Sequence, residues 1–207
     1  MIKFNLSSKL YFAIKIFVLF TFVCIKSYAD NSKPNKNLIS FGENDAVIKI
    51  KVFSSLTCPH CANFHKKVIP ELKKEYVESG KAQLIFIDFP LDQAAFNASK
   101  LLHCVDRSMQ MKLLDTIYEK QNEWTNGSNI NDINNNLKKI AKNLGISSNK
   151  FNGCLVDQSI SDRILDGRIN ANKKYSIEST PTIVINEKKL EGSVSFNNIK
   201  KNIEKII

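Results

Sequence analysis

The stretch Cys58-Pro59-His60-Cys61 places two thiols with two residues between them, directly after the apolar-rich run 47–56 and at the start of a helical pattern. At a helix N-terminus, unpaired backbone N–H groups and the positive end of the helix dipole favour an anion. A thiolate at Cys58 would be that anion, and the thiolate is the nucleophilic form of cysteine. Pro59 suits the first helical turn, where its missing N–H costs nothing, and His60 adds a nearby positive charge. The stretch therefore predicts a dithiol redox site.

Two other interpretations of this cysteine pair remain open. A lone pair at this spacing can be half of a zinc site, but such sites usually add a second pair of Cys or His ligands at short range. His65 lies four residues after Cys61 and is a possible third ligand, but no fourth follows nearby. The second alternative is an inert structural disulfide between Cys58 and Cys61. We predict redox chemistry, with no metal and no other cofactor.

The first 29 residues have the three parts of a secretory signal peptide. The start is basic, and no acidic residue precedes Asp30. Residues 16–25 form an uninterrupted run of ten mostly apolar residues, and Ser27 and Ala29 are small residues where a signal peptidase inspects the chain. A membrane span needs about 20 apolar residues, so an uncleaved anchor is the alternative and would include the residues before this run. We predict a cleaved signal at residues 1–29 and a periplasmic protein.

Export would remove Cys24 with the signal and leave an even number of cysteines in a compartment where disulfides persist. The remaining chain holds 26 basic and 20 acidic residues, so its net charge is +6 instead of +10. Only three of the basic residues are arginines, and no lysine run is interleaved with aromatic residues. Proteins that bind nucleic acids rely on arginine forks and clustered charge. We therefore predict no nucleic-acid partner and a solvated lysine surface.

The first half of the exported chain predicts a strand, a helix and a second strand. Residues 47–53 alternate apolar residues with lysine, the pattern of a half-buried strand. Residues 60–79 predict a helix that ends at Gly80, with a kink at Pro70. Residues 82–89 are mostly apolar and predict a central strand. Because no hairpin signal separates the strands, they should form a parallel βαβ unit.

The second half is predicted to be helical at first and to return to strands near its end. Helices are expected at residues 92–105, 109–120, 130–144, from 146 onward and at 159–175, with a loop around Trp124. A hairpin of strands 181–186 and 189–194 and a last helix from about 196 to 206 follow. About 178 residues after the signal suffice for one domain with a core or a small domain with an insertion. The fold that fits is a small α/β sheet with a helical cap at about residues 92–176, between its βαβ and ββα halves.

This arrangement resembles the DsbA-type thiol:disulfide oxidoreductases of the thioredoxin superfamily over essentially all of residues 30–207. Three stretches carry the resemblance: Phe53-Ser54-Ser55-Leu56-Thr57-Cys58-Pro59-His60-Cys61, Phe64-His65, and Thr180-Pro181-Thr182 at the start of a strand. The resemblance implies a thioredoxin-like fold with a mixed central sheet and flanking helices. It also implies that Pro181 follows a cis peptide bond beside the active-site pair, and that Thr180 and Pro181 hold an extended substrate segment.

The resemblance also directs attention to two other features. Many thioredoxin-like proteins carry a buried acid six positions before the first active-site cysteine, where it assists proton transfer. Here that position is Val52, so the role is unfilled or is played by another group. Some relatives carry a second cysteine pair within the cap, which Cys104 and Cys154 match. The resemblance therefore implies a structural disulfide between them, and two buried free thiols are the alternative.

The function implied by the resemblance is donation of the Cys58–Cys61 disulfide to reduced exported proteins. A substrate thiolate would attack Cys58, and a second substrate thiolate would resolve the mixed disulfide. The resemblance also implies re-oxidation by a membrane quinone-linked oxidase, and we expect a monomer. An isomerase or reductase on the same fold and a non-catalytic thioredoxin-like binding module remain alternatives. Isomerases of this superfamily commonly carry a separate dimerisation domain, whereas only about 17 residues are expected between the signal and the first strand.

Overall fold

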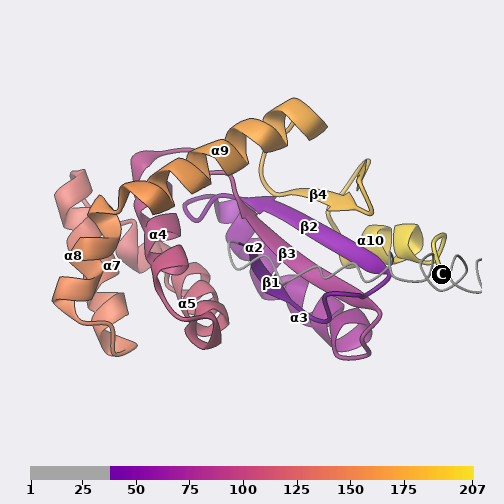
Figure 1. Ribbon diagram of the computed structural model, residues 1–207, viewed down its shortest axis with the longest axis horizontal. Helices are drawn as coiled ribbons and strands as arrows, with labels where there is room; N and C mark the ends of the chain where they lie inside the picture. Colours follow the sequence, from indigo (N-terminus) through magenta and orange to yellow (C-terminus); the bar gives the residue numbers. More distant parts are fainter. Residues whose placement is uncertain (1–37) are drawn as a thin grey trace, which may run out of the picture. The chain divides into compact units, whose positions relative to one another are not determined.

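A computed structural model describes residues 38–207, and the predicted signal peptide lies outside this range. A five-stranded sheet in the order β1-β3-β2-β4-β5 forms the centre of this part (Figure 1). The strands are β1 Ile39–Phe41, β2 Ile48–Ser54, β3 Ala82–Asp88, β4 Thr182–Ile185 and β5 Lys188–Lys189. Strands β2 and β3 are parallel and the other neighbours are antiparallel. The sheet is therefore mixed, as predicted.

The side-chain pattern of β2 decides which face of the sheet meets the main core. Ile48, Ile50 and Val52 are at most 1% exposed on one face, whereas the intervening lysines are half-buried on the other. The parallel register pairs Ser54 with Asp88. Both central strands therefore end at the same edge of the sheet, and the segment that carries the two thiols begins there.

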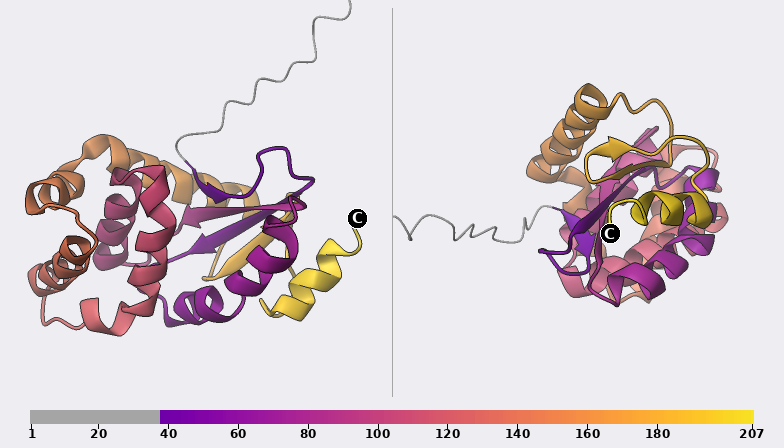
Figure 2. Two further views of the ribbon diagram at one scale, coloured as in Figure 1. Left: turned by 90° about the horizontal axis from the view of Figure 1, so that it is seen from below. Right: turned by 90° about the vertical axis from the view of Figure 1, so that its right-hand side faces the viewer.

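Helices cover both faces of the sheet (Figure 2). The main core lies between the sheet and the helices that follow β2 and β5, and it includes Ile199 and Ile203 of α10, Phe196–Ile203. A smaller cluster on the other face includes Phe53, Val184 and Ala171. Among residues 38–207, no helix has the length and apolar character needed to cross a membrane.

The helix predicted for residues 60–79 is divided into three short pieces. These are α2 Pro59–Lys67, α3 Ile69–Leu72 and the π-helical turn η1 Lys73–Val77. The division falls at Val68, two residues before Pro70. Proline has no N–H to donate, and its ring clashes with the carbonyl one turn earlier. The expected kink is thus a one-residue break, at which Val68 keeps helical backbone angles.

Six helices lie between β3 and β4 in the chain. They are α4 Gln93–Cys104, α5 Arg107–Glu119, α6 Gln121–Trp124, α7 Ile130–Asn143, α8 Ser148–Val156 and α9 Gln158–Tyr175. Several start at Asp, Asn or Ser residues whose side chains accept hydrogen bonds from backbone N–H groups in the first turn, which explains where they begin. Helices α4, α5, α7 and α8 stand at one end of the sheet, and α9 runs from them back along it (Figure 1).

Four local features differ from the predictions. Strand β1 was not predicted, because its three residues form a strand only by pairing antiparallel with β3. The expected loop around Trp124 contains the short helix α6, which buries this indole; its Nε1 donates to the Ile117 carbonyl at 2.9 Å. The strand expected at 189–194 is only the two residues of β5, and α10 ends before the predicted residue 206.

Candidate active site

Cys58 is the residue that immediately precedes the first turn of α2. Its backbone is extended, with φ −75° and ψ 119°, and Pro59 occupies the first turn. The Cys58 N–H donates to the Ser55 carbonyl at 3.1 Å, and the Ala62 N–H donates to the Cys58 carbonyl at 3.1 Å. The backbone N–H groups of His60 and Cys61, in the first turn of α2, contact the Cys58 side chain and stabilise a negative charge there.

The segment before β4 forms the opposite wall of the site. The Thr180–Pro181 peptide bond is cis, and the Cys58 Sγ lies 3.4 Å from the Thr180 carbonyl oxygen. Within the described residues, the Thr180 hydroxyl is buried without a hydrogen-bond partner. It is therefore available to a thiolate at Cys58. The structure thus brings together the two stretches on which the predicted site depends, more than 120 residues apart in the chain.

Opposing effects act on the pKa of Cys58. Burial disfavours the thiolate, but the side chain of Thr180 and the backbone N–H groups of Cys61 and His60 outweigh it, so the pKa lies below its ordinary value. The His60 side chain is exposed. The prediction gave His60 a role through its side-chain charge, whereas its contact with the sulfur is made by its backbone.

Cys61 is in a different environment one turn into α2. It is 1% exposed, compared with 8% for Cys58. Burial raises the pKa of Cys61 to about 12, even though the Thr180 side chain and the Ser55 backbone act in the opposite direction. Of this pair, Cys58 is therefore the thiol that ionises at the lower pH. Both cysteines are free thiols in the structure.

Residues of the helical region hold the turn that carries Cys58, and sequence reasoning missed them. The buried Gln121 side chain in α6 donates through Nε2 to the carbonyls of Leu56 at 2.8 Å and Cys58 at 3.1 Å. The Thr57 hydroxyl donates to Asp92, which precedes α4, at 2.7 Å. A glutamine and an aspartate at helix starts give no sequence signal for such contacts, because their partners lie more than 30 residues away.

Cys104 and Cys154 form a disulfide with a Cα–Cα distance of 5.7 Å. It joins the last residue of α4 to α8, 50 positions later in the chain. Cys154 is completely buried. The disulfide lies within the helical region, apart from the sheet, so it connects elements of the cap and does not take part in the Cys58 site.

Two buried histidines are each paired with an aspartate. His103 Nε2 lies 2.6 Å from Asp88, and burial of Asp88 is outweighed by this contact, so the pKa of Asp88 is lowered. His65 Nε2 lies 2.6 Å from Asp115 on α5. The structure places both histidines on helices. Among residues 38–207, no three His, Cys, Asp or Glu side chains gather as metal ligands would.

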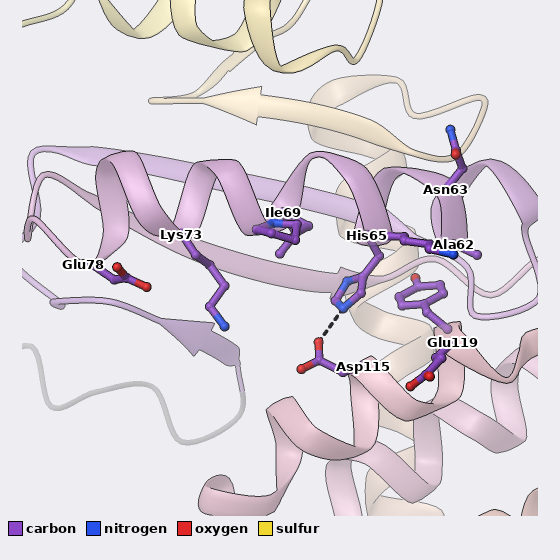
Figure 3. Close-up of a pocket in the computed structure, with 11 residues that line it drawn as sticks. Ala62, Asn63, His65, Ile69, Lys73, Glu78, Asp115 and Glu119 are labelled. Carbon is purple, nitrogen blue, oxygen red and sulfur yellow. Dashed lines mark hydrogen bonds and ion pairs between the residues drawn. The ribbon is translucent and has the colours of Figure 1, made fainter.

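A pocket of about 580 Å³ lies beside α2, between this helix and α5 (Figure 3). Ala62 and Ile69 contribute apolar surface, and the His65–Asp115 pair lies within it. The pocket is distinct from the wall formed by Thr180 and Pro181, neither of which lines it. It provides the His65 side of α2 with an opening to solvent.

Comparison with known proteins agrees with this architecture. The family model described as Thioredoxin matches residues 34–205. A "Putative protein-disulfide oxidoreductase" of Rickettsia bellii is 27% identical over 88% of this chain and 70% of its own length. A "Probable disulfide bond formation protein D" of Bacillus anthracis is 27% identical over 80% of this chain and 76% of its own length. The chain spans between 63% and 77% of the length of such curated relatives.

Solved structures show the same relationship. The crystal structure of Wolbachia pipientis alpha-DsbA1 superposes with a TM-score of 0.75 at 29% identity, covering 84% of this chain and 91% of the other. Oxidised BdbD from Bacillus subtilis superposes with a TM-score of 0.70 at 21% identity, covering 83% and 93%, which supports the fold alone. The chain therefore belongs to the thioredoxin family, and within it to the DsbA-like disulfide oxidoreductases.

Proposed function

We propose that this protein is an exported oxidase that donates the Cys58–Cys61 disulfide to reduced secreted proteins. The observation that carries the proposal is the difference between the two thiols: the pKa of Cys58 is lowered and that of Cys61 is raised to about 12. A sulfur with a low pKa is a good leaving group in thiol–disulfide exchange. Stabilising the Cys58 thiolate favours the dithiol form of the protein, which makes its disulfide an oxidant.

The proposed reaction has two exchange steps. A substrate thiolate attacks the Cys58 sulfur of the oxidised protein, the Cys58–Cys61 bond breaks, and Cys61 leaves with its electron pair and takes up a proton. A second substrate thiolate then attacks the substrate sulfur of the mixed disulfide. The substrate disulfide forms and Cys58 leaves as a thiolate, which Thr180 and the α2 backbone N–H groups stabilise. The substrate is oxidised by two electrons and the protein is reduced by two.

Thr180 and Pro181 are proposed to hold the substrate next to Cys58. They directly precede β4, and the carbonyl of Thr180 lies beside the Cys58 sulfur. An extended substrate segment could pair with this backbone through main-chain hydrogen bonds, as in strand addition. Such binding depends little on the side chains of the substrate, which suits an enzyme that acts on many unfolded proteins.

The second candidate function is isomerisation or reduction of substrate disulfides by the same fold, in place of their formation. Measurement of the reduction potential of the Cys58–Cys61 pair separates the two. We expect a potential well above that of a reducing thioredoxin and rapid oxidation of a reduced, unfolded protein that contains two cysteines. Cys58→Ser should abolish this activity, and Cys61→Ser should accumulate a mixed disulfide at Cys58. A strongly reducing potential would contradict the oxidase proposal, and the absence of any exchange would favour a non-catalytic binding module.

The place of action and the partner are also proposals. A secreted oxidase must be re-oxidised after each turnover, and a membrane quinone-linked oxidase is the partner that we propose. Cell fractionation should find the mature protein in the periplasm, beginning at Asp30 by N-terminal sequencing. Quinone depletion should leave Cys58 and Cys61 reduced in cells. A cytoplasmic protein that retains residues 1–29 would contradict this assignment.

A further inference from the structure

Proton transfer at Cys61 is a step that the site described above does not explain. Burial raises the pKa of Cys61 to about 12, so its thiolate is a poor leaving group unless a proton reaches the sulfur as the disulfide opens. Val52, six positions before Cys58, is an apolar residue with 1% exposure and cannot supply one. Some other group must therefore carry protons to and from this buried sulfur.

His65 is a suitable group because of its position on α2. It follows Cys61 by four residues, and side chains at this spacing are neighbours on one helix face. Both residues are among the buried side chains of α2. Side chains on a helix also lean toward its N-terminus, so the imidazole leans toward the turn that holds Cys61.

Asp115 fixes the form of the imidazole that can accept a proton. The His65 Nε2 lies 2.6 Å from an Asp115 carboxylate oxygen (Figure 3). Because a carboxylate can only accept a hydrogen bond, the proton of neutral His65 is on Nε2, and Nδ1 is left as an acceptor. The Nδ1 atom is buried and has no hydrogen-bond partner in the described part of the chain.

Tyr118 on α5 packs against the same imidazole and completes the arrangement. The two rings lie 4.7 Å apart between centroids. The Tyr118 hydroxyl is also buried without a hydrogen-bond partner among residues 38–207. Burial, followed by the charge of a Cys61 thiolate, raises the pKa of Tyr118 well above its ordinary value. The hydroxyl therefore stays protonated near neutral pH, although the Ser54 side chain acts in the opposite direction on its pKa.

The pocket beside α2 gives this group a route to solvent. His65, Tyr118 and half-exposed Asp115 all line it. The other charged side chains that line this pocket come from α2, α5 and the segment around η1: Lys66, Glu119, Lys73 and Glu78. These four carry two positive and two negative charges. They leave Asp115 as the charged group in contact with the imidazole.

We propose that His65, held by Asp115, is the acid–base group for the Cys61 thiol, and that the Tyr118 hydroxyl and a water molecule from the pocket carry the proton between them. This inference rests on the proposed exchange at Cys58. When a substrate thiolate attacks Cys58, the Cys58–Cys61 bond breaks and Cys61 takes a proton that protonated His65 supplies. In the reverse direction the Cys61 sulfur attacks Cys58 of a mixed disulfide, the substrate leaves as a thiolate, and His65 Nδ1 receives the Cys61 proton.

The test is the rate of exchange with glutathione in both directions, measured by rapid mixing in His65→Gln and Tyr118→Phe. The Gln side chain keeps a donor for Asp115 but cannot carry a proton, and Phe keeps the Tyr118 ring. We expect both variants to be slower by about a hundredfold at neutral pH, the usual contribution of an acid–base group. Reduction by the thiol and oxidation by the disulfide should slow by the same factor, with the reduction potential unchanged, because only the path of the proton is lost.

The pH profile distinguishes proton transfer from a structural role. The advantage of wild type over His65→Gln should decrease as pH rises, because hydroxide in solution takes over the proton transfer. Equal slowing at every pH, a changed potential, or wild-type rates in His65→Gln or Tyr118→Phe would overturn the relay.

Asp115→Asn provides a test that does not alter a buried residue, because Asp115 is 52% exposed. It should slow exchange in the same pH-dependent way, since an amide can either accept from or donate to Nε2 and no longer fixes one tautomer. Glu119→Gln is the matched control, with the same loss of charge on the same helix but no contact with His65, and it should exchange at the wild-type rate. Equal rates for the two variants would overturn the role of Asp115. If the wild-type protein shows no exchange at Cys58, the proposed function has failed, and the relay is not the cause.

Discussion

At the scale of single residues, the central feature is that two cysteines on one helix differ in ionisation. Cys58 is at the helix start with Thr180 against its sulfur, whereas Cys61 is enclosed by the core. Burial acts on both thiols, but only Cys58 has enough hydrogen-bond donors to overcome it. A single residue change at Thr180 should therefore alter the reactivity of the pair.

We expect Thr180→Val to raise the pKa of Cys58. Valine keeps the shape of threonine but cannot donate a hydrogen bond to the thiolate, which is one of the effects that lower this pKa. The measurement is the ultraviolet absorbance of the thiolate as a function of pH in reduced protein. His60→Ser should change the pKa by less, because the backbone contact of residue 60 is kept and the His60 side chain is exposed to solvent. An unchanged titration in Thr180→Val would refute the role of this hydroxyl.

The same ionisation sets the pH dependence of alkylation. The rate at which iodoacetamide modifies the reduced protein should rise as pH passes through the lowered pKa of Cys58 and then level off. Cys61 should stay unmodified over this range, because its pKa is about 12. Peptide mapping after brief alkylation checks both points. Modification of Cys61 before Cys58 would contradict the assignment of the nucleophile.

At the scale of secondary-structure elements, the helical region positions the active-site turn. Helix α6 presents Gln121 to the carbonyls of Leu56 and Cys58, and the start of α4 presents Asp92 to Thr57. These contacts connect the cap with the turn at the end of β2. The cap therefore has a mechanical role in the site beyond covering one end of the sheet.

Gln121→Met should destabilise the protein and slow exchange. Methionine has a similar length but no hydrogen-bond donor. The buried carbonyls of Leu56 and Cys58 would therefore each lose a hydrogen bond. The expected cost is about 1–3 kcal/mol in the free energy of unfolding. Urea titration measures it, and Gln158→Met at an exposed position of α9 is the control. Wild-type stability in Gln121→Met would show that water replaces these bonds.

Removal of the cap disulfide should lower stability without abolishing exchange. Cys104 and Cys154 are 50 residues apart, and closing such a loop in the unfolded chain stabilises the fold by up to roughly 4 kcal/mol. Cys104→Ala with Cys154→Ala should therefore melt at a lower temperature while still reacting at Cys58. Mass spectrometry of exported protein should find the two cysteines joined. If both thiols were free there, the structural role would be wrong.

At the scale of the whole molecule, the redox state of the active-site pair should change the stability of the fold. Interactions with Thr180 and the α2 backbone stabilise the Cys58 thiolate in the folded protein and are absent from the unfolded chain. An oxidising disulfide therefore requires the reduced form to be the more stable one, because the redox and folding equilibria form a closed cycle. This is opposite in sign to the effect of a structural disulfide.

We expect the reduced protein to melt above the oxidised protein, with both measured in the Cys104→Ala/Cys154→Ala background. The folded pKa of Cys58 is depressed, so its stabilising effect is complete above the unfolded pKa of about 8.5 and is lost as pH falls through the folded pKa. The folded pKa of Cys61 is raised, so its effect is present below about pH 8.5 and is lost as pH rises. The advantage of the reduced form should therefore be greatest near pH 8.5. A higher melting temperature for the oxidised form would contradict the oxidase proposal.

The sequence by itself determined those features that depend on near neighbours in the chain. The placement of Cys58 before Pro59 marks a helix start, and the alternation in β2 marks a half-buried strand, because both effects act within a few residues. The motif of Thr180 and Pro181 was identified by resemblance. The order of these elements predicted a small α/β sheet with a helical cap. The resemblance implied that this sheet is mixed and thioredoxin-like, and the comparisons confirm the fold.

The tertiary structure alone decided how the two thiols differ and which distant groups serve them. The same residue type ionises easily at Cys58 and not at Cys61, because burial depends on what packs against each sulfur. Gln121 and Asp115 reach the site from elements more than 45 residues away, and β1 exists through its pairing with β3. Desolvation and long-range hydrogen bonds depend on spatial neighbours that local sequence patterns do not encode, so the sequence located the active site but the fold determined its chemistry.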